Sequence, residues 1–216
     1  GISGRTVTVK GLAVGTFKLT VKGDGKNYNQ SAVTITVNVV PGATKKITAT
    51  NQVKGIKLSW KKVPGATGYL VYRDKKLVKT VKGTSYTDKG ANKNGKKYVF
   101  KIVAKAASGT STKSKSLTTY RTARPGLKSV TSEEPTTIKI TWSKNAKGNG
   151  YEILYGLKKN LKGAKKVKIT KKATLQRLVK KLTSGKTYYV KVRAYKKAGG
   201  KKYYSAWSVT KKIQVK

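Results

Sequence analysis

The sequence lacks cysteine, histidine and methionine entirely among its 216 residues. Without cysteine there are no disulfides and no thiol nucleophiles, and without histidine as well there is no Cys/His zinc site and no imidazole for acid–base catalysis. The absence of cysteine leaves the compartment open, although it is compatible with an exported protein that does not rely on oxidation. Only 2 Phe accompany 13 Tyr, and apolar residues make up 37% of the chain. This composition favours several small cores over one large core.

Acidic residues are scarce, and the six in the chain are Asp24, Asp74, Asp88, Glu133, Glu134 and Glu152. Glu133 and Glu134 are adjacent and precede Pro135, so their side chains diverge. Paired-carboxylate hydrolysis needs two carboxyl groups facing each other across a cleft, so we interpret this pair as part of a solvated loop. Asp88 is expected to form a turn, and no set of carboxylates converges on a calcium site. The sequence therefore predicts no catalytic residues, no metal site, no cofactor and no enzyme activity.

Positive charge dominates the chain, because 51 Lys and Arg against 6 Asp and Glu give a formal net charge of +45. Such a surface attracts polyanions, and the candidate partners are nucleic acid, anionic cell-wall polymers, acidic polysaccharides and acidic membrane surfaces. Only six of the basic residues are arginine, the residue that base-specific readout and phosphate clamps favour. The lysine bias therefore predicts diffuse, salt-sensitive attraction or plain solubility, and no specific recognition of nucleic acid.

Apolar and polar residues alternate along most of the chain, as side chains do on the two faces of a β-strand. The alternating stretches are ITATNQVKGIKLSW, GYLVYR, KYVFKIVAK, TTIKITW, GYEILY and TYYVKVRAY. Turns rich in Gly, Asn, Ser and Lys separate them, which is typical of an all-β sandwich. No convincing 3.6-residue stripe occurs, so almost no helix is expected.

Two parts of the chain repeat the same landmarks. IKLSW at 56–60 matches IKITW at 138–142, and nine residues after each tryptophan a tyrosine, Tyr69 or Tyr151, opens the next alternating stretch. Further on, NGKKYVFKIVA matches SGKTYYVKVRA, each with a glycine three residues before a tyrosine. Repetition at a nearly constant spacing predicts two similar domains, at residues 42–123 and 124–216.

In combination these landmarks resemble the fibronectin type III family, a sandwich of two sheets; the landmark residues are Trp60, Tyr69, Tyr98, Trp142, Tyr151, Leu182, Gly185 and Tyr188. The second copy has the whole Leu-x-x-Gly-x-x-Tyr pattern, which implies a tyrosine corner. The first has Ala91 and Asn92 where the leucine would fall, so its corner is expected to be looser. Over about 170 residues, both copies look like the lysine-rich type III modules of Gram-positive bacterial surface and secreted proteins. The resemblance implies this fold and an extracellular location, at a bacterial cell surface or secreted.

Residues 1–41 follow a different pattern. RTVTVKG, GTFKLTVKG and SAVTITVNVV predict three strands, which together resemble the C-terminal part of a bacterial immunoglobulin-like domain. Three strands cannot bury both faces of a sandwich, so this part is expected to be truncated or completed by strand pairing with another chain. No stretch of the chain approaches the roughly 18 apolar residues of a membrane span. The chain begins with Gly1 rather than Met, so we interpret it as a fragment of a longer protein. Short Pro-Gly joints at 41–42 and 125–126 predict tandem sandwiches in an extended arrangement.

The stretch GKTYYVKVRAYKKAGGKKYYSAWS at 185–208 interleaves aromatic and basic side chains. If Tyr188 points into the core, alternation places every second residue after it on the outer face, beside residues of the next strand. This predicts a candidate ligand face for stacking sugars or bases, made of Tyr189, Lys191, Arg193, Tyr195, Tyr203 and Trp207. Outward tyrosines also simply favour strands and pair across them, and we favour this ordinary interpretation. The first copy supports it, because its equivalent face at 99–105 has the same strand plan without an aromatic residue.

Glu152 is the only acid on an expected strand. Alternation with Tyr151 points it outward, where Lys191 or Arg193 would face it in an exposed pair worth about 0–1 kcal/mol. An outward position also disfavours the role of a buried acid that promotes a Lys–Asn isopeptide bond.

Three functions fit these observations. The leading hypothesis is a non-catalytic extracellular spacer or adhesion module of a bacterial surface or secreted protein, associated with an anionic cell-wall polymer through its lysines. The second is a carbohydrate-binding module that uses the Tyr and Trp face of the second domain for a host or plant glycan. The third is non-specific binding of nucleic acid or other polyanions, which so large a positive charge causes at low salt.

Overall fold

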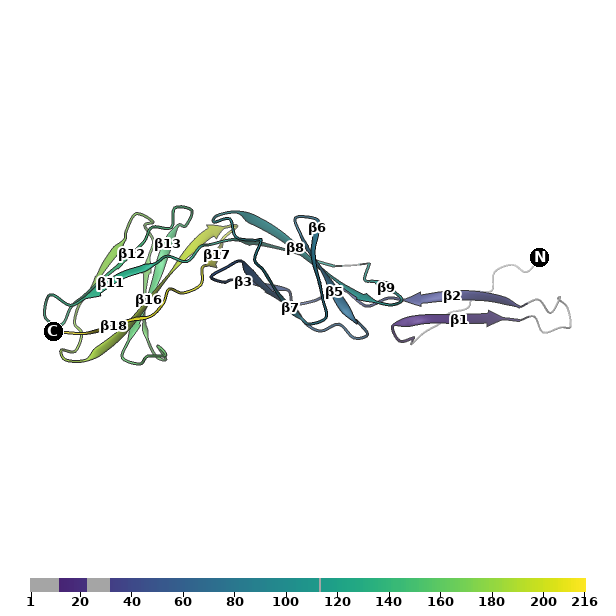
Figure 1. Cartoon of the computed structure of the whole chain (residues 1–216), viewed down its shortest axis with the longest axis horizontal. Helices are drawn as coiled ribbons and strands as arrows, with labels where there is room; N and C mark the ends of the chain where they lie inside the picture. Colours follow the sequence, from purple (N-terminus) through teal and green to yellow (C-terminus); the bar gives the residue numbers. More distant parts are fainter. Residues whose placement is uncertain (1–11, 23–31, 113) are drawn as a thin grey trace. The chain divides into compact units, whose positions relative to one another are not determined.

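The computed structural model describes residues 12–22, 32–112 and 114–216, and all the regular secondary structure in those residues is β-strand (Figure 1). The all-β class is thereby confirmed. The contacts divide the chain into two compact units, of which the first comprises Gly1–Thr48, Ser59–Tyr86 and Val99–Leu117, and the second Ala49–Leu58, Thr87–Tyr98 and Thr118–Lys216. The domain boundaries and the extended arrangement stay predictions. In the described part of the chain, no helix has the length and apolar character needed to cross a membrane.

Strands β1 (Gly15–Val21) and β2 (Val33–Val39) form a two-stranded antiparallel sheet. They are two of the three strands expected in residues 1–41, and the other, RTVTVKG, lies outside the described residues. Apolar side chains of β2 are exposed, with Val33 at 59% and Ile35 at 49%. The Ser108 hydroxyl donates a hydrogen bond to the Val39 carbonyl at 2.8 Å, which attaches the end of β2 to the turn after β8. Strand pairing with another chain stays a prediction.

Residues 48–120 contribute two sheets, one in the order β3-β4-β7 and one in the order β10-β8-β5-β6, with β9 also paired to β8. Their strands are β3 (Thr48–Asn51), β4 (Ile56–Ser59), β5 (Gly68–Arg73), β6 (Lys76–Val81), β7 (Ser85–Asp88), β8 (Lys97–Ala106), β9 (Gly109–Thr110) and β10 (Ser116–Tyr120). Asp74 and Lys75 alone join β5 to β6, and both have the positive φ, 49° and 70°, that a two-residue hairpin turn requires. Asp88 forms the expected turn, since its Oδ1 accepts the Gly90 N–H at 2.9 Å.

Residues 127–214 form a two-sheet sandwich within the second unit, which we call the second sandwich. One sheet has the order β11-β12-β15, and the other has the order β14-β13-β16-β17, with β18 also paired to β16. The strands are β11 (Leu127–Thr131), β12 (Ile138–Trp142), β13 (Gly150–Gly156), β14 (Lys165–Ile169), β15 (Gln176–Val179), β16 (Thr187–Ala198), β17 (Lys201–Tyr204) and β18 (Lys211–Gln214). The pairing is antiparallel throughout, so short turns suffice to connect most neighbours.

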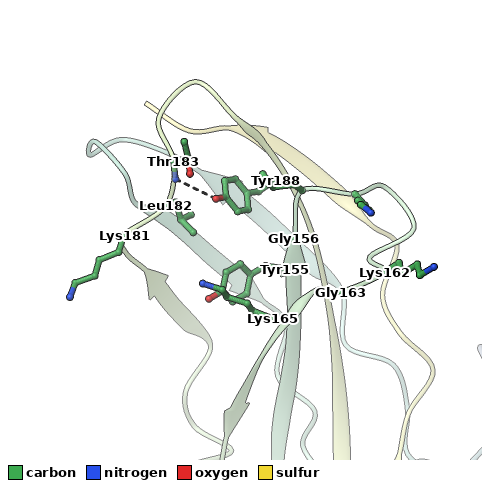
Figure 2. A pocket seen from close by; sticks show the side chains of 11 residues that line it. Tyr155, Gly156, Lys162, Gly163, Lys165, Lys181, Leu182, Thr183 and Tyr188 are labelled. Atoms are coloured by element: carbon green, nitrogen blue, oxygen red, sulfur yellow. Dashed lines mark hydrogen bonds between the residues drawn. The ribbon is translucent and has the colours of Figure 1, made fainter.

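A tyrosine corner precedes β16. The Tyr188 hydroxyl accepts the Thr183 N–H at 3.3 Å, as the sequence pattern implied (Figure 2). Gly185 lies between them with a φ of 73°, a conformation that other residues rarely adopt. The first copy has the same bond, from the Lys93 N–H to the Tyr98 hydroxyl at 3.2 Å. The first corner, expected to be looser, therefore keeps its hydrogen bond although alanine replaces leucine.

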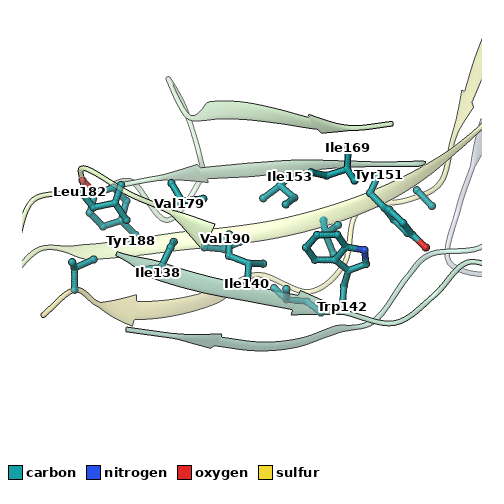
Figure 3. Packing of buried hydrophobic residues seen from close by; sticks show 14 residues of the cluster. Ile138, Ile140, Trp142, Tyr151, Ile153, Ile169, Val179, Leu182, Tyr188 and Val190 are labelled. Carbon is teal, nitrogen blue, oxygen red and sulfur yellow. The ribbon is translucent and has the colours of Figure 1, made fainter. Parts of the chain in front are cut away.

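One hydrophobic core lies between the two sheets of the second sandwich (Figure 3). Ile138 and Ile140 of β12 are fully buried, and so are Ile153 of β13 and Val192 of β16 from the facing sheet. They occupy alternate positions of their strands, which confirms that the apolar face of each alternation points inward. Burial of apolar surface, at about 25 cal/mol per Å², is the main term that stabilises such a sandwich.

The landmark aromatics pack as pairs in both copies. The rings of Trp142 and Tyr151 lie 5.4 Å apart, and so do those of Trp60 and Tyr69. The hydroxyl of each tyrosine of these pairs accepts the N–H of the residue six positions before it, at 2.9 Å. The same residue types therefore build the same local structure twice.

Gly150 leaves no room for a side chain. A Cβ atom there would lie 2.2 Å from the Ile169 carbonyl oxygen and 2.6 Å from the Tyr195 hydroxyl. We expect Gly150→Ala to lower the free energy of unfolding of the second sandwich by about 1–3 kcal/mol through overpacking. Urea denaturation followed by tryptophan fluorescence measures this loss. Gly126→Ala is the control, because its Cβ would approach nothing closer than Ser143 Oγ at 3.4 Å; equal losses in both variants would contradict the argument.

Candidate functional site

Strand β16 carries four of the six residues of the candidate ligand face. Strand β17 pairs with its residues 195–198 and β18 with its residues 187–190, so the last strand is interrupted between them. Trp207 lies in this interruption, at 205–210, which corrects the expectation that it belongs to a continuous last strand.

Ser205 and Ser208 replace the strand pairing beside the middle of β16. Their N–H groups donate to the carbonyls of Ala194 and Val192, both at 2.8 Å. Their hydroxyls accept the N–H groups of the same two β16 residues, both at 3.0 Å. A serine oxygen thus stands where a paired strand would place its carbonyl, and the buried backbone groups of β16 are satisfied. In the stretch YSAWS each serine directly follows an aromatic residue, Ser205 after Tyr204 and Ser208 after Trp207. The two aromatic residues are therefore three positions apart, like the two serines.

Arg193 contacts two aromatic rings on the outer face of the sheet. Its Cζ lies 3.8 Å from the centroid of the Tyr204 ring and 4.4 Å from that of Trp207. Lys191 Nζ lies 5.0 Å from the same Trp207 centroid. A cation over a ring face gains about 0.5–2 kcal/mol, depending on how far it is desolvated. We call Lys191, Arg193, Tyr204 and Trp207 the cation–aromatic stack.

Tyr195 is only 2% exposed, which corrects its expected place on an accessible face. Its ring lies over Gly150, its hydroxyl donates to the Ile169 carbonyl at 3.4 Å, and Lys202 Nζ lies 4.7 Å from its centroid. Burial raises the pKa of Tyr195, and the neighbouring Tyr204 and Glu152 raise it further. Strand alternation correctly placed Tyr195 on the outer face of the sheet, but neighbouring side chains on that face, such as Lys202 and Tyr204, cover its ring.

Glu152 pairs with Arg193 as expected, but it is buried, at 2% exposed. Its Oε2 accepts hydrogen bonds from Arg193 Nε at 2.8 Å and from Arg193 Nη2, and Lys166 Nζ lies 3.8 Å from its Oε1. The sequence predicted an exposed ion pair that contributes little to stability. In the structure the carboxylate of Glu152 is instead desolvated, because the long side chains around it exclude water. Breaking such a pair leaves an unpaired buried charge, which is costly.

The remaining residues of the candidate face lie apart from the stack. Tyr203 packs its ring 5.0 Å from that of Tyr120, and Tyr189 is opposite Gly156 and Lys212 in the sheet register. The structure therefore brings together Lys191, Arg193 and Trp207, and it adds Tyr204, which the sequence pattern did not single out. The signal that could have found Tyr204 is the repeated aromatic–serine step in YSAWS.

The first copy keeps only part of the serine arrangement and has no aromatic residues beside it. The Ser111 N–H donates to the Ala104 carbonyl at 2.9 Å, and the Ser114 hydroxyl donates to the Ile102 carbonyl. Lysine and valine occupy the equivalent outer positions, Lys101 and Val103. The strand plan therefore does not require the cation–aromatic stack, which is a feature of the second copy.

A polar cluster that no sequence pattern indicated lies in the second unit, around the end of β10. Asn51 is 6% exposed, and its Nδ2 donates to the carbonyls of Tyr120 at 3.1 Å and Tyr204 at 2.9 Å. Its Oδ1 accepts the Thr122 N–H at 3.0 Å and Arg121 Nη1 at 3.3 Å. One buried amide therefore connects β3, the segment after β10, and β17.

Arg121 is 4% exposed, and neutral oxygens accept its hydrogen bonds. Besides Asn51, Nη1 bonds the Thr122 carbonyl at 2.9 Å and Nη2 the Val53 carbonyl at 3.0 Å, while Nε has no partner among the described residues. Burial lowers the pKa of Arg121, and its interaction with Tyr98 acts to raise it. Because a guanidinium stays charged, this site depends on every carbonyl that it contacts.

Two further asparagines complete the cluster. Asn94 Nδ2 donates to Asn145 Oδ1 at 2.9 Å, Asn145 Nδ2 donates to the Ala123 carbonyl at 2.6 Å, and the Ala123 N–H donates to Asn94 Oδ1 at 2.9 Å. The Thr122 hydroxyl donates to the Tyr203 carbonyl at 2.8 Å. We call Asn51, Asn94, Arg121, Thr122 and Asn145 the polar joint.

Comparison with known proteins bears on the second copy. Residues 123–211 match the family model of the fibronectin type III domain. This part of the chain is therefore similar to fibronectin type III domains. The crystal structure of the chicken CNTN1 FN1–FN3 domains is 16% identical, with a TM-score of 0.45, and the match covers 95% of this chain and 79% of that one. No curated protein sequence matches the chain significantly. In the described residues of the chain, no group of three or more acidic, His or Cys side chains could hold a metal ion.

Coupling between Glu152 and Arg193 is testable by a double-mutant cycle in the second sandwich. Arg193→Met leaves the buried carboxylate without its main partner, so we expect it to lower the free energy of unfolding by about 3–5 kcal/mol. The Glu152→Gln, Arg193→Met double variant should lose less than the sum of the single losses, measured by urea unfolding. The control is Glu134→Gln, an exposed acid whose loss should stay within about 0.5 kcal/mol. Additive single losses would show that the pair is not coupled.

Proposed function

We propose that the chain is a non-catalytic spacer or adhesion module of an extracellular protein, at a bacterial surface or secreted. The polar joint is the observation that carries this proposal, because a spacer needs stiff connections and the joint ties β3, the segment after β10 and β17 together within the second unit. The type III match at 123–211 and the repeated landmarks support tandem sandwiches. The resemblance to lysine-rich bacterial type III modules supports the location.

The polar joint limits motion through buried polar groups. Each of its hydrogen bonds contributes about 0.5–1.5 kcal/mol, but a buried donor or acceptor that loses its partner costs about 1–3 kcal/mol. Bending between β3 and β17 would break both bonds of Asn51 Nδ2 at once. The buried Arg121 would lose its oxygen partners in the same movement. The polar joint is therefore expected to resist bending as long as water does not reach its buried hydrogen-bonding groups.

The stiffness of the joint can be measured by spin labelling, since the chain has no cysteine of its own. Labels on Lys89→Cys and Lys171→Cys, both exposed positions of the second unit, should give a narrow distance distribution by pulsed electron resonance. Asn51→Ala should broaden it, because Asn51 makes four of the joint's hydrogen bonds. Asn160→Ala, in an exposed loop, should leave it unchanged. An unmodified joint that gives as broad a distribution as Asn51→Ala would contradict the stiff spacer.

The same module is proposed to associate with anionic polymers such as those of a cell wall. The net charge of +45 supports this, together with lysines that are all at least partly exposed in the described residues. The alternative glycan site on the Tyr and Trp face gains no support, because cations of the chain itself already lie against Trp207 and Tyr204. Binding of nucleic acid at low salt would follow from the same charge without being specific.

Association through diffuse charge predicts a steep dependence on salt. Affinity for purified teichoic acid should fall by about tenfold or more between about 50 and 200 mM salt, because binding releases condensed counterions. Isothermal titration at several salt concentrations measures this slope, with neutral dextran as the control that should not bind. Tight binding that does not change in strong salt would count against the charge mechanism.

A further inference from the structure

A cavity opens at one end of the second sandwich, between the loop after β13 and the tyrosine corner (Figure 2). Its volume is about 480 Å³, within the range of several hundred Å³ that is usual for small-molecule sites. Tyr155, Leu182 and Tyr188 line it, and four lysines surround it: Lys158, Lys162, Lys165 and Lys181.

The loop that forms this cavity belongs to the second copy alone. In the first copy, two residues join β5 to β6, whereas residues 157–164 separate β13 from β14. This longer loop is ordered by its own bonds, from the Leu161 N–H to the Lys158 carbonyl at 2.8 Å and from the Lys162 N–H to Asn160 Oδ1 at 2.9 Å. Leu161 anchors it, at 8% exposed. An ordered insertion at the end of a rigid sandwich is a common place for a binding site.

Two tyrosines give the cavity a fixed aromatic wall. Tyr155 is half-buried against the core, at the end of the inward-facing row of β13. The Thr183 N–H holds the Tyr188 hydroxyl at 3.3 Å. Lys165 is directly opposite Tyr155 in the register of β13 and β14. An aromatic face beside a cation suits a ligand that has both a ring and a negative charge.

The charged residues that line the cavity are all lysines. Each is a compact point charge on a flexible stem, which can follow an anionic group without a fixed geometry. Figure 2 shows Lys162 and Lys181 pointing outward from the rim, where they would attract an approaching anion. An uncharged ligand would gain hydrogen bonds at most from these four side chains, and a cationic ligand would be repelled by them.

We propose that this cavity binds an anionic sugar unit, with the sugar ring against Tyr155 and its phosphate or carboxylate group among the rim lysines. The inference rests on the proposed association with anionic polymers and adds a defined site to the diffuse attraction. It differs from the Tyr and Trp face, because the stack lies on the outer face of the sheet and the cavity lies at the open end of the sandwich.

The test compares two lysine variants of the full chain with equal charge. The cavity variant carries Lys158→Gln, Lys162→Gln, Lys165→Gln and Lys181→Gln, and the control carries Lys171→Gln, Lys172→Gln, Lys197→Gln and Lys212→Gln, all exposed. The probes are a hexose 6-phosphate, a hexuronate, the neutral hexose and inorganic phosphate, at about physiological ionic strength. Amide shifts in nuclear magnetic resonance spectra report the site and the affinity, and melting temperatures confirm that both variants fold.

We expect at least one anionic sugar to shift the amides of 155–165 and 181–183. The cavity variant should lose about tenfold or more in affinity for it, and the control should stay within about twofold. The neutral hexose and inorganic phosphate should each bind more weakly than the anionic sugar, because each lacks one of the two recognised features. Tyr155→Leu should weaken the sugar probe without changing the affinity for inorganic phosphate.

Equal losses in both lysine variants, or shifts spread over the lysine surface, would overturn the cavity site. So would the absence of binding by both anionic sugars. If either result occurs while teichoic acid still binds with a steep salt dependence, the diffuse association stands and only the cavity site fails. Cavity-specific binding of an anionic sugar without any binding of the polymer would support the cavity site and overturn the diffuse association.

Discussion

The scarcity of carboxylates is the constraint that decides how the arginines packed within this protein are accommodated. A buried cation needs a partner, and 51 basic residues share only 6 acidic ones. Arg193 takes one of these, Glu152, and adds the rings of Tyr204 and Trp207. Arg121 takes none and uses carbonyl and amide oxygens. The guanidinium group can be partnered in both ways, since its edge donates hydrogen bonds while its face stacks on aromatic rings. Lysine, which is more strongly hydrated, is never buried in the described residues.

Tyr204 connects the surroundings of Arg193 with those of Arg121. Its ring contacts Arg193 in the cation–aromatic stack, and its carbonyl accepts a hydrogen bond from Asn51 in the polar joint. Strand β17 pairs with β16 along its four residues, and these two contacts hold its last residue further. The stretch that first suggested a ligand site therefore contacts the polar joint through Tyr204.

Comparison of the two copies distinguishes the features that the fold requires from those that are present in one copy alone. Both copies keep the paired Trp and Tyr, the tyrosine corner and one bond from a serine N–H to an alanine carbonyl, Ser111 to Ala104 and Ser205 to Ala194. Only the second has the stack and the long loop between β13 and β14. Because function is added to a common fold at loops and faces, these differences mark where the second copy has acquired properties of its own.

The sequence by itself determined the all-β class and the inward face of the strands that form the cores, because these follow from period-two alternation. The tyrosine corner was implied by the resemblance to the type III family. Alternation also assigned Glu152 and Tyr195 to the correct face. It did not show that both are buried, because burial on an outer face depends on which long side chains arrive from other strands. The polar joint joins residues as distant as Asn51 and Tyr204, and the cavity joins Tyr155 to the corner at 182–188. Only the tertiary structure decided these sites, since their residues carry no local pattern and become neighbours through strand pairing alone.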